Sequence, residues 1–295
     1  MTAGTRTATE GNPSTPSTGR IPWAALAWFG VLLAACYGQV LVRLVAQWSG
    51  DEDMGHGFFV PLVSGFIVWQ RREELLAVKP KPTWWGLLAV AWGAAQLYIA
   101  MLGAELFLAR TAFLISLTGI ILLAGGVPVL RIVAFPLFLL LFMIPIPAII
   151  YNVVTFRLQL LASRLAEAAL AMLGVPVLRE GNILELASQR LSVVEACSGI
   201  RSLLTLSFLS LVYAYFFDRR VWMRWVLLAA TVPIALVANA SRVTVTGLLS
   251  EVNPELAEGI FHTASGWVIF MVGLGLLILV HAAISKSWKL VYGRN

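Results

Sequence analysis

Three side chains of complementary chemistry, Cys197, Arg242 and His262, lie far apart in the sequence. A thiolate attacks carbonyl carbon, an imidazole exchanges protons near neutral pH, and a guanidinium keeps its positive charge. Together they could carry out acyl transfer, with Cys197 as nucleophile and His262 as general base and then acid. Arg242 would stabilise the thiolate or the oxyanion of a tetrahedral intermediate.

Each of the three residue types also has an ordinary structural role. A boundary cysteine usually packs as a small hydrophobe, and a histidine at a helix start can cap or anchor that helix. An arginine near a helix end commonly extends its guanidinium to lipid headgroups. Spacing alone therefore does not establish a catalytic set, so the elements that carry these residues and the local sequence must decide.

The composition indicates that the surrounding solvent is a lipid bilayer. Of the 295 residues, 59% are apolar and only 12% are charged, far from the balance of a soluble domain. The net charge of +6 is typical of Lys and Arg kept in cytoplasmic loops and does not indicate nucleic-acid binding. Two cysteines cannot form a disulfide framework, and a bridge between Cys36 and Cys197 is not expected.

The first residues differ in composition from the rest. Residues 1–20 are rich in Thr, Ser, Gly and Pro, which predicts a disordered cytoplasmic tail before a single integral membrane domain at 21–295. The residues 33–36, Leu-Ala-Ala-Cys, resemble a lipoprotein cleavage box. However, the apolar run continues to Val45, which favours an uncleaved anchor helix.

Eight segments are apolar enough to be considered as membrane-spanning helices, each of which needs about 20 residues. The second is short and contains Pro61. The expected spans are Pro22–Gln47, Gly57–Gln70, Trp84–Leu102, Leu106–Ala124, Val129–Ile150, Ile200–Phe217, Trp222–Leu249 and Thr263–Ile284.

Loop charges orient these spans in the inner membrane, because short cytoplasmic loops hold the excess of Lys and Arg. Basic residues mark the loops at 71–81, 131 and 219–224 and the tail at 286–294, whereas acidic residues gather in the alternate loops. Both termini are therefore predicted to be cytoplasmic. The same scheme places Cys197, Arg242 and His262 together at the outer, periplasmic boundary.

The segment Val153–Leu173 could cross the membrane, but Arg157, Arg164 and Glu167 recur along one helical face. This pattern is typical of an amphipathic helix at the interface, and a crossing would translocate the basic residues at 219–220. A short extracytoplasmic hairpin is then predicted around Ile183–Leu186 and Leu191–Val194, leading to Cys197. The thiol would follow at a helix N-terminus, where the helix dipole favours the anion.

The local sequence adds a resemblance. Residues 195–201, Glu-Ala-Cys-Ser-Gly-Ile-Arg, precede an apolar helix and are followed by Asn-Ala-Ser-Arg at 239–242 and Phe-His at 261–262. This order closely resembles the exosortase and archaeosortase family, mainly over residues 195–267. The N-terminal half agrees only loosely, chiefly through His-Gly-Phe at 56–58 and the helix that follows.

The resemblance implies a membrane cysteine transpeptidase that sorts proteins. Its substrates would carry a C-terminal signal made of a Pro-Glu-Pro-like motif, a transmembrane helix and a basic cluster. The enzyme would cleave near the motif and transfer the protein to an acceptor in the cell envelope or outside the cell. By this resemblance Cys197 is the nucleophile, Arg242 the electrostatic partner and His262 the acid–base residue.

Further residues are weaker candidates for the site. The resemblance includes Asn239, which lies one turn before Arg242 and could orient it. Glu195 could tune the thiol or face water, and Arg201 shares a helical face with Cys197. His56 follows an acidic run in which a metal or substrate contact is conceivable, but a solvated loop is the simpler interpretation. Headgroup contacts account for Arg43 and Arg110, which could also bind an acidic sorting motif.

Three other functions remain open: a protease that hydrolyses the signal, a transporter or channel, and a noncatalytic scaffold for exopolysaccharide assembly. A transporter predicts polar residues at mid-membrane, and these spans contain few. No Walker loop, dinucleotide fingerprint or metal-ligand cluster occurs, so no cofactor, metal or nucleic-acid partner is expected. The sequence does not specify the substrates, the acceptor or the oligomeric state.

Overall fold

The computed structural model describes residues 23–193, 199–252 and 260–293. The predicted tail at 1–20, Glu195 and Cys197 lie outside these ranges. The elements in chain order are α1 (Trp23–Gly50), η1 (Glu52–Phe58), α2 (Phe59–Gln70), α3 (Arg72–Ala77), α4 (Trp85–Leu102), α5 (Leu106–Ala124), α6 (Gly126–Leu139), η2 (Leu140–Met143), α7 (Ala148–Met172), β1 (Val177–Glu180), β2 (Ile183–Leu186), β3 (Arg190–Ser192), α9 (Gly199–Phe217), α10 (Val221–Val252) and α11 (Ile260–Tyr292).

Six helical segments within the described residues are long and apolar enough to cross a membrane. They are Ala27–Gly50, Trp85–Leu102, Leu106–Ala124, Gly126–Met143, Val221–Val252 and Gly266–Val291. The chain is therefore a multi-pass membrane protein. Two predicted spans fall short of this length: α2 has only 12 residues, and the apolar part of α9 is Arg201–Phe217. The count of eight spans stays a prediction.

The fifth predicted span, Val129–Ile150, is wrong beyond Met143. The helix α6 ends at Leu139, one turn of η2 follows to Met143, and α7 begins at Ala148. Between them the chain carries Pro145 and Pro147, which lack the amide hydrogen that a continuous helix needs. The apolar residues continued across this break, so hydrophobicity alone did not reveal it.

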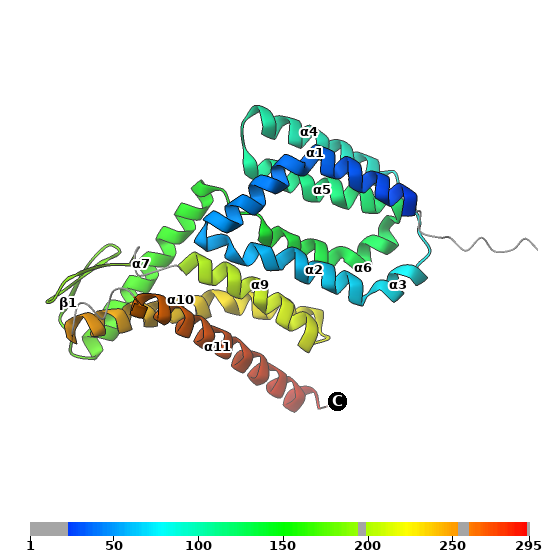
Figure 1. The fold of residues 1–295 in the computed structure, drawn as a ribbon. Helices are drawn as coiled ribbons and strands as arrows, with labels where there is room; N and C mark the ends of the chain where they lie inside the picture. Colours follow the sequence, from blue (N-terminus) through cyan, green and yellow to red (C-terminus); the bar gives the residue numbers. More distant parts are fainter. Residues whose placement is uncertain (1–22, 194–198, 253–259, 294–295) are drawn as a thin grey trace, which may run out of the picture.

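The helices form two groups (Figure 1). In one group α5 packs against α1, α4 and α6, and α2 packs against α6. In the other, α10 packs against α9, α11 and α7. Glycines bring α4 and α5 especially close, because a Cβ atom on Gly86 would lie 2.6 Å from the carbonyl oxygen of Gly119. Such close backbone approach is a common way to pack helices in lipid.

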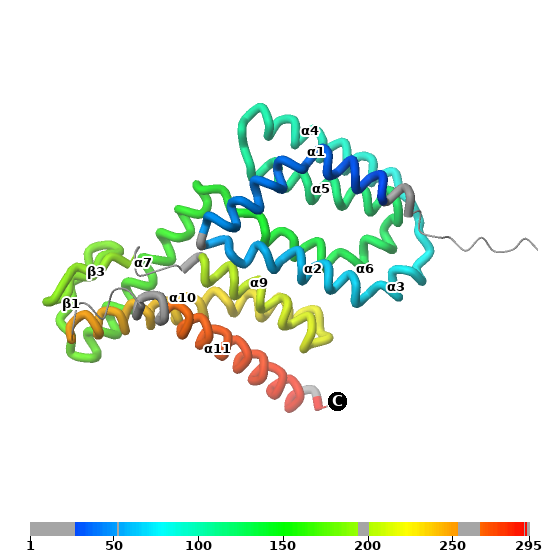
Figure 2. The backbone as a smooth tube through the Cα atoms, viewed as in Figure 1, coloured from blue at the N-terminus to red at the C-terminus, as the bar shows by residue number. Residues whose placement is uncertain are grey.

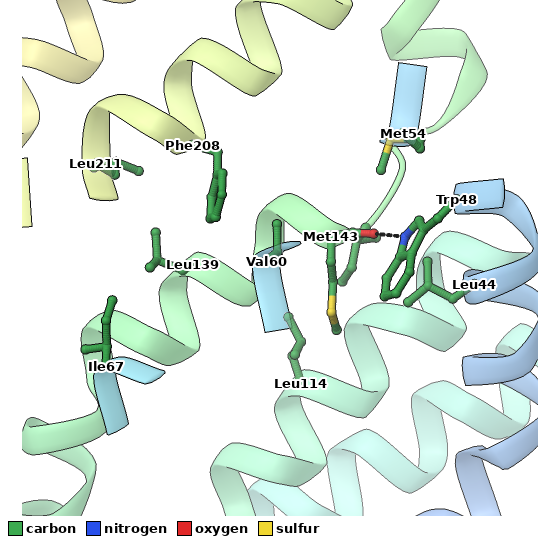
Figure 3. Close-up of a cluster of buried hydrophobic side chains, with 11 residues drawn as sticks. Leu44, Trp48, Met54, Val60, Ile67, Leu114, Leu139, Met143, Phe208 and Leu211 are labelled. Carbon is green, nitrogen blue, oxygen red and sulfur yellow. Dashed lines mark hydrogen bonds between the residues drawn. The ribbon is translucent and has the colours of Figure 1, made fainter. Parts of the chain in front are cut away.

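Trp48 fixes the end of α1 against the other helices of the first group. Its indole Nε1–H donates a hydrogen bond to the carbonyl oxygen of Met143, at 2.9 Å. Its ring also meets the Phe58 ring edge to face, with centroids 5.2 Å apart. Figure 3 shows the bond to Met143 within a cluster of buried apolar side chains that includes Leu44 and Val60. The contacts join the end of α1 to η1 and η2.

A small antiparallel sheet lies in the chain between α7 and α9 (Figure 2). Its order is β1-β2-β3, with Glu180 paired to Ile183 across a turn in which Gly181 has a φ of +65°. β2 is the predicted first strand, whereas β1 adds a strand that the sequence analysis did not expect. Leu184 and Leu191 are buried against α7, so the sheet and this helix share a core. The side of the membrane on which the sheet lies stays a prediction.

A polar cluster joins α9, α10 and α11 at the end of the second group where the chain turns from α9 into α10. Asp218, buried in this turn, accepts hydrogen bonds from the Arg220 guanidinium, at 2.7 Å and 3.0 Å, and lies 3.1 Å from His281 Nε2. The Tyr213 hydroxyl lies 2.9 Å from His281 Nδ1. Arg220 lowers the pKa of Asp218 to about 2, so the carboxylate is ionised at neutral pH.

Candidate functional site

The predicted site residues fall at the opposite end of these three helices. Arg242 and Asn239 lie on α10, and Arg201 lies in the first turn of α9. His262 belongs to the first turn of α11, where the backbone is described but the side chain is not. Cys197 and Glu195 precede α9, outside the described residues. The geometry of the site therefore rests on Arg201, Asn239 and Arg242.

Arg242 is buried at the contact between α10 and α11, with only 7% of its surface exposed. Its guanidinium faces Gly266: a Cβ atom built on this glycine would lie 3.6 Å from the arginine Cζ. Gly266 follows position 262 by four residues, so the two positions share one face of α11. A buried guanidinium thus lies one helical turn from the histidine position.

Asn239 is also buried, with 6% of its surface exposed. It borders a small cavity of about 20 Å³ together with Arg242, Gly266 and Ser202 of α9. Residues of all three helices, α9, α10 and α11, border this cavity beside the predicted site residues. The motif identified Asn239, but Ser202 was missed because a single serine in an apolar helix carries no distinctive sequence signal.

Arg201 is held by an acidic group that comes from the first half of the chain. Its Nε–H donates to a carboxylate oxygen of Asp53 in η1, at 2.7 Å. The Tyr151 hydroxyl of α7 donates a hydrogen bond to the other carboxylate oxygen of Asp53. One carboxylate therefore ties the first turn of α9 to η1 and α7, and it joins the two groups of helices.

The electrostatics of this cluster are consistent with a fixed network. Burial raises the pKa of Tyr151 well above its usual value, and the hydrogen bond to Asp53 raises it further, so the phenol remains a donor. Asp51 helps to fix the position of Asp53, because the Asp51 side chain accepts a hydrogen bond from the Asp53 amide at 2.9 Å. The carboxylate of Asp53 thus binds Tyr151 and Arg201 together, a contact that the sequence did not predict.

The sequence interpretation of His56 as part of a solvated loop is wrong, because its side chain does not face solvent. It is buried, with 8% of its surface exposed, and its Nε2 lies 3.2 Å from the carbonyl oxygen of Phe142. Burial lowers its pKa, so the imidazole is neutral at pH 7. Within the described residues, no cluster of three His, Cys, Asp or Glu side chains could hold a metal ion. The contact with Phe142 makes His56 part of the packing between η1 and η2.

Two other arginines were interpreted as contacts to headgroups. Arg43 is exposed, as that interpretation requires. Arg110 differs, because only 4% of its surface is exposed and its guanidinium donates to the Gln47 side chain at 2.8 Å. The expectation of a headgroup contact is therefore wrong for Arg110, which joins α5 to α1.

Two features define the class of protein to which this chain belongs. It has several apolar helices long enough to cross a membrane, and it has a buried cationic centre at one end of α9, α10 and α11. The protein is a multi-pass membrane protein with a polar site at a helix boundary. The model of the transmembrane exosortase family matches residues 48–279, most of the chain, and the chain belongs to this family. No curated protein and no solved structure matches it.

Proposed function

We propose that the protein is a membrane cysteine transpeptidase that cleaves a C-terminal sorting signal and transfers the cleaved protein to an acceptor outside the cytoplasm. One observation carries this proposal: the buried Arg242 guanidinium faces the turn of α11 that follows His262. Membership of the exosortase family supports the same assignment. A buried arginine in a membrane helix is energetically costly, which favours a functional role over a packing role.

The proposed chemistry uses three side chains. The Cys197 thiolate attacks the scissile carbonyl carbon, and Arg242 stabilises the negative charge that develops on the carbonyl oxygen. The carbon–nitrogen bond breaks, and His262 gives its proton to the leaving nitrogen. The resulting thioester is attacked by an acceptor hydroxyl or amine whose proton passes to His262, and the thiolate leaves. Water in place of the acceptor would give hydrolysis.

The other site residues would position these groups. Asp53 holds Arg201, and thereby the first turn of α9, which begins two residues after Cys197. Asn239 lies beside Arg242 on the same cavity and would limit its rotamers. Glu195 would tune the thiol from the preceding segment. No cofactor is needed for this chemistry, because the thiol, the imidazole and the guanidinium supply the nucleophile, the proton transfer and the positive charge.

The membrane topology proposed from the loop charges has eight crossings with both termini cytoplasmic. Contacts at the two ends of α2 place this helix alongside α6 and η2, which together form a candidate span. At one end His56 meets Phe142, and at the other the Arg71 guanidinium donates to the carbonyl oxygen of Ile132, at 2.6 Å. Phe142 lies at the η2 end of the α6–η2 segment and Ile132 lies ten residues earlier, so α2 runs along the second half of this candidate span. The site would then face the periplasm of a bacterial inner membrane.

The test is the processing of a co-expressed membrane protein that ends in a Pro-Glu-Pro-type signal. Wild type should shorten this substrate, whereas Cys197→Ala and Cys197→Ser should not, at equal expression. Cys36→Ala is a matched control, because Cys36 is an exposed residue of α1 far along the chain from the motif. Continued processing by Cys197→Ala would remove the nucleophile and favour the scaffold function.

The mass of the processed product separates transfer from hydrolysis. A transpeptidase leaves the substrate with an acceptor joined to its new C-terminus, whereas a protease leaves a free carboxylate. The comparison is made on the same purified product, so it does not depend on the rate of cleavage. A free carboxylate alone would make the protein a hydrolytic membrane protease with the same three groups.

A further inference from the structure

A large apolar cavity lies in the first group of helices, away from the proposed catalytic residues. Its volume is about 700 Å³, and it is bordered by residues of α1, α2, α3, α5, α6 and η2. Among them are Leu44, Val68 and Val133, and nearly all of the exposed lining is apolar. The neighbouring Val45 is 43% exposed on the outside of α1, so the lining continues to the surface that faces lipid.

The cavity extends along the length of these helices. Trp48 and Met143 border it at the end close to η1, and Val78 and Pro80 border it at the other end. Lys81 follows Pro80 and donates its backbone amide to the carbonyl oxygen of Gly125, at 3.0 Å. The second end of the cavity therefore lies where α5 stops and α6 begins.

Basic residues lie next to this second end in the chain. Lys79 and Lys81 flank Pro80, which borders the cavity, and both are exposed, so their charges are available to a ligand. Acidic residues occur here too: Glu74 is paired with Arg71 at 2.6 Å, and Glu73 is exposed. Two lysines against Glu73 leave this end net positive, while the interior is apolar.

The charge at one end of the cavity selects among hydrophobic occupants. A substrate helix followed by a basic cluster, as the proposed function expects, would bring like charges to Lys79 and Lys81. Flexible hydrocarbon chains match the apolar lining without this repulsion. Basic rims at the cytoplasmic ends of membrane helices favour anionic headgroups.

We propose that this cavity binds an anionic phospholipid, with its acyl chains between α1, α2, α5 and α6 and its phosphate at Lys79 and Lys81. The lipid would fill a space that the protein's own side chains leave open, and it would stabilise the contact between these helices. Given the orientation from the loop charges, it comes from the cytoplasmic leaflet.

Gly65 allows the cavity to be filled without a clash. It borders the cavity, and a Cβ atom built on it meets no atom within 4 Å. Gly65→Phe should therefore place a ring in the space of the acyl chains. Gly275→Phe is the matched control, because Gly275 on α11 also has open space around it but does not border the cavity.

The experiment is native mass spectrometry of the full-length protein, reconstituted with equimolar phosphatidylglycerol and phosphatidylcholine. Wild type and Gly275→Phe should retain phosphatidylglycerol, and Gly65→Phe should retain about tenfold less. Lys79→Gln with Lys81→Gln should lower the preference for phosphatidylglycerol over phosphatidylcholine by about tenfold. Circular dichroism of each variant checks that its helices remain.

Three results would overturn the proposal. One is equal retention of the two lipids by wild type, and another is unchanged retention by Gly65→Phe. The third is tight retention of a lipid other than a phospholipid in place of phosphatidylglycerol when the protein is taken directly from membranes. None of these measurements uses substrate cleavage, so their outcome is independent of the transpeptidase activity.

Discussion

At the scale of single residues, Asp53 makes more contacts around the candidate site than its position in the sequence suggests. Its carboxylate binds Arg201 and Tyr151, two residues from different parts of the chain. Sequence analysis selected Arg201 because it follows Cys197 by four residues, but it offered no partner. A pairing across 148 positions leaves no periodic pattern, so only the folded chain reveals it.

Removing this pairing should impair processing more than it impairs folding. Asp53→Asn should lower kcat/KM about five- to tenfold, because a charged hydrogen bond of roughly 1–1.4 kcal/mol no longer holds the first turn of α9. Arg201→Gln should have a similar effect, and the double variant should lose little more than either single variant. The measurement is the rate of substrate shortening by purified variants in lipid.

A carboxylate–arginine pair elsewhere provides the control for this test. Arg71 and Glu74 form an exposed pair, 2.6 Å apart, at the opposite end of α2. Glu74→Gln should leave processing unchanged, because exposed pairs contribute little and this one is far from the site. Additive losses from Asp53→Asn and Arg201→Gln would mean that the two residues act separately.

Arg242 should not be replaceable by lysine. The guanidinium is planar and presents several donors, whereas an ammonium is a compact charge on a flexible chain. With Arg242 buried against Gly266, Arg242→Lys should keep the positive charge but lower kcat about 10²-fold or more, as for loss of an oxyanion donor. Single-turnover kinetics with a peptide thioester measure the effect on acyl transfer. Full activity of the lysine variant would show that Arg242 acts only through its positive charge and not through the geometry of its guanidinium.

At the scale of elements, the cluster around Asp218 should make the second helix group sensitive to acid. The pKa of Asp218 is about 2 in the folded protein, below its ordinary value of 3.8. The ionised carboxylate therefore stabilises the fold above about pH 4, and this contribution is lost as the pH falls toward 2. His281 and Arg220 contact this carboxylate, so the loss would loosen α11 from the turn between α9 and α10.

The comparison of wild type with Asp218→Asn measures this contribution. The Tm of wild type should exceed that of the variant at pH 5, where Asp218 is ionised, and the difference should shrink below pH 4. Thermal unfolding followed by intrinsic fluorescence in lipid nanodiscs is the measurement. A Tm difference that stays the same from pH 5 down to pH 2 would show that the charge of Asp218 is not the source of the stability.

The contact between α4 and α5 depends on small residues in both helices. A Cβ atom on Gly119 would lie 2.8 Å from the backbone nitrogen of Val90, which cannot move aside as a side chain could. Gly119→Ala should lower the free energy of unfolding by about 1–3 kcal/mol, in spite of the better helix propensity of alanine. Gly275→Ala, on an open stretch of α11, should instead be neutral or stabilising. Denaturant titration of both variants gives the two values.

At the scale of the whole molecule, the sequence predicted the helices better than it predicted their junctions. The predicted segment Leu106–Ala124 agrees with α5, and Trp84–Leu102 differs from α4 by one residue. Long apolar runs bounded by Gly or charged residues have few alternatives in a membrane. The junction from η2 to α7 was missed because its residues are as apolar as those of the neighbouring helices.

In the candidate site too, some residues could be predicted from the sequence and others could not. Local motifs selected Arg242, Asn239 and Arg201, and the fold brings these residues to one end of α9, α10 and α11. Ser202, Asp53 and Tyr151 were missed, because their importance comes from contacts across the fold. The burial of Arg110 was missed for the same reason, since its partner Gln47 lies 63 residues earlier.

Impermeant thiol labelling can determine which loops share a side of the membrane. In a Cys36→Ala, Cys197→Ala background, the exposed positions Ser49 and Ala187 are predicted to lie outside, and Lys79 and Lys286 inside. Single cysteines at 49 and 187 should therefore react with a charged maleimide in intact spheroplasts. Single cysteines at 79 and 286 should react only after the membrane is permeabilised. If α2 turned back without crossing, Lys79 would react together with Ser49. In that case the basic rim of the large cavity would face the periplasm, and its phospholipid would have to come from the outer leaflet.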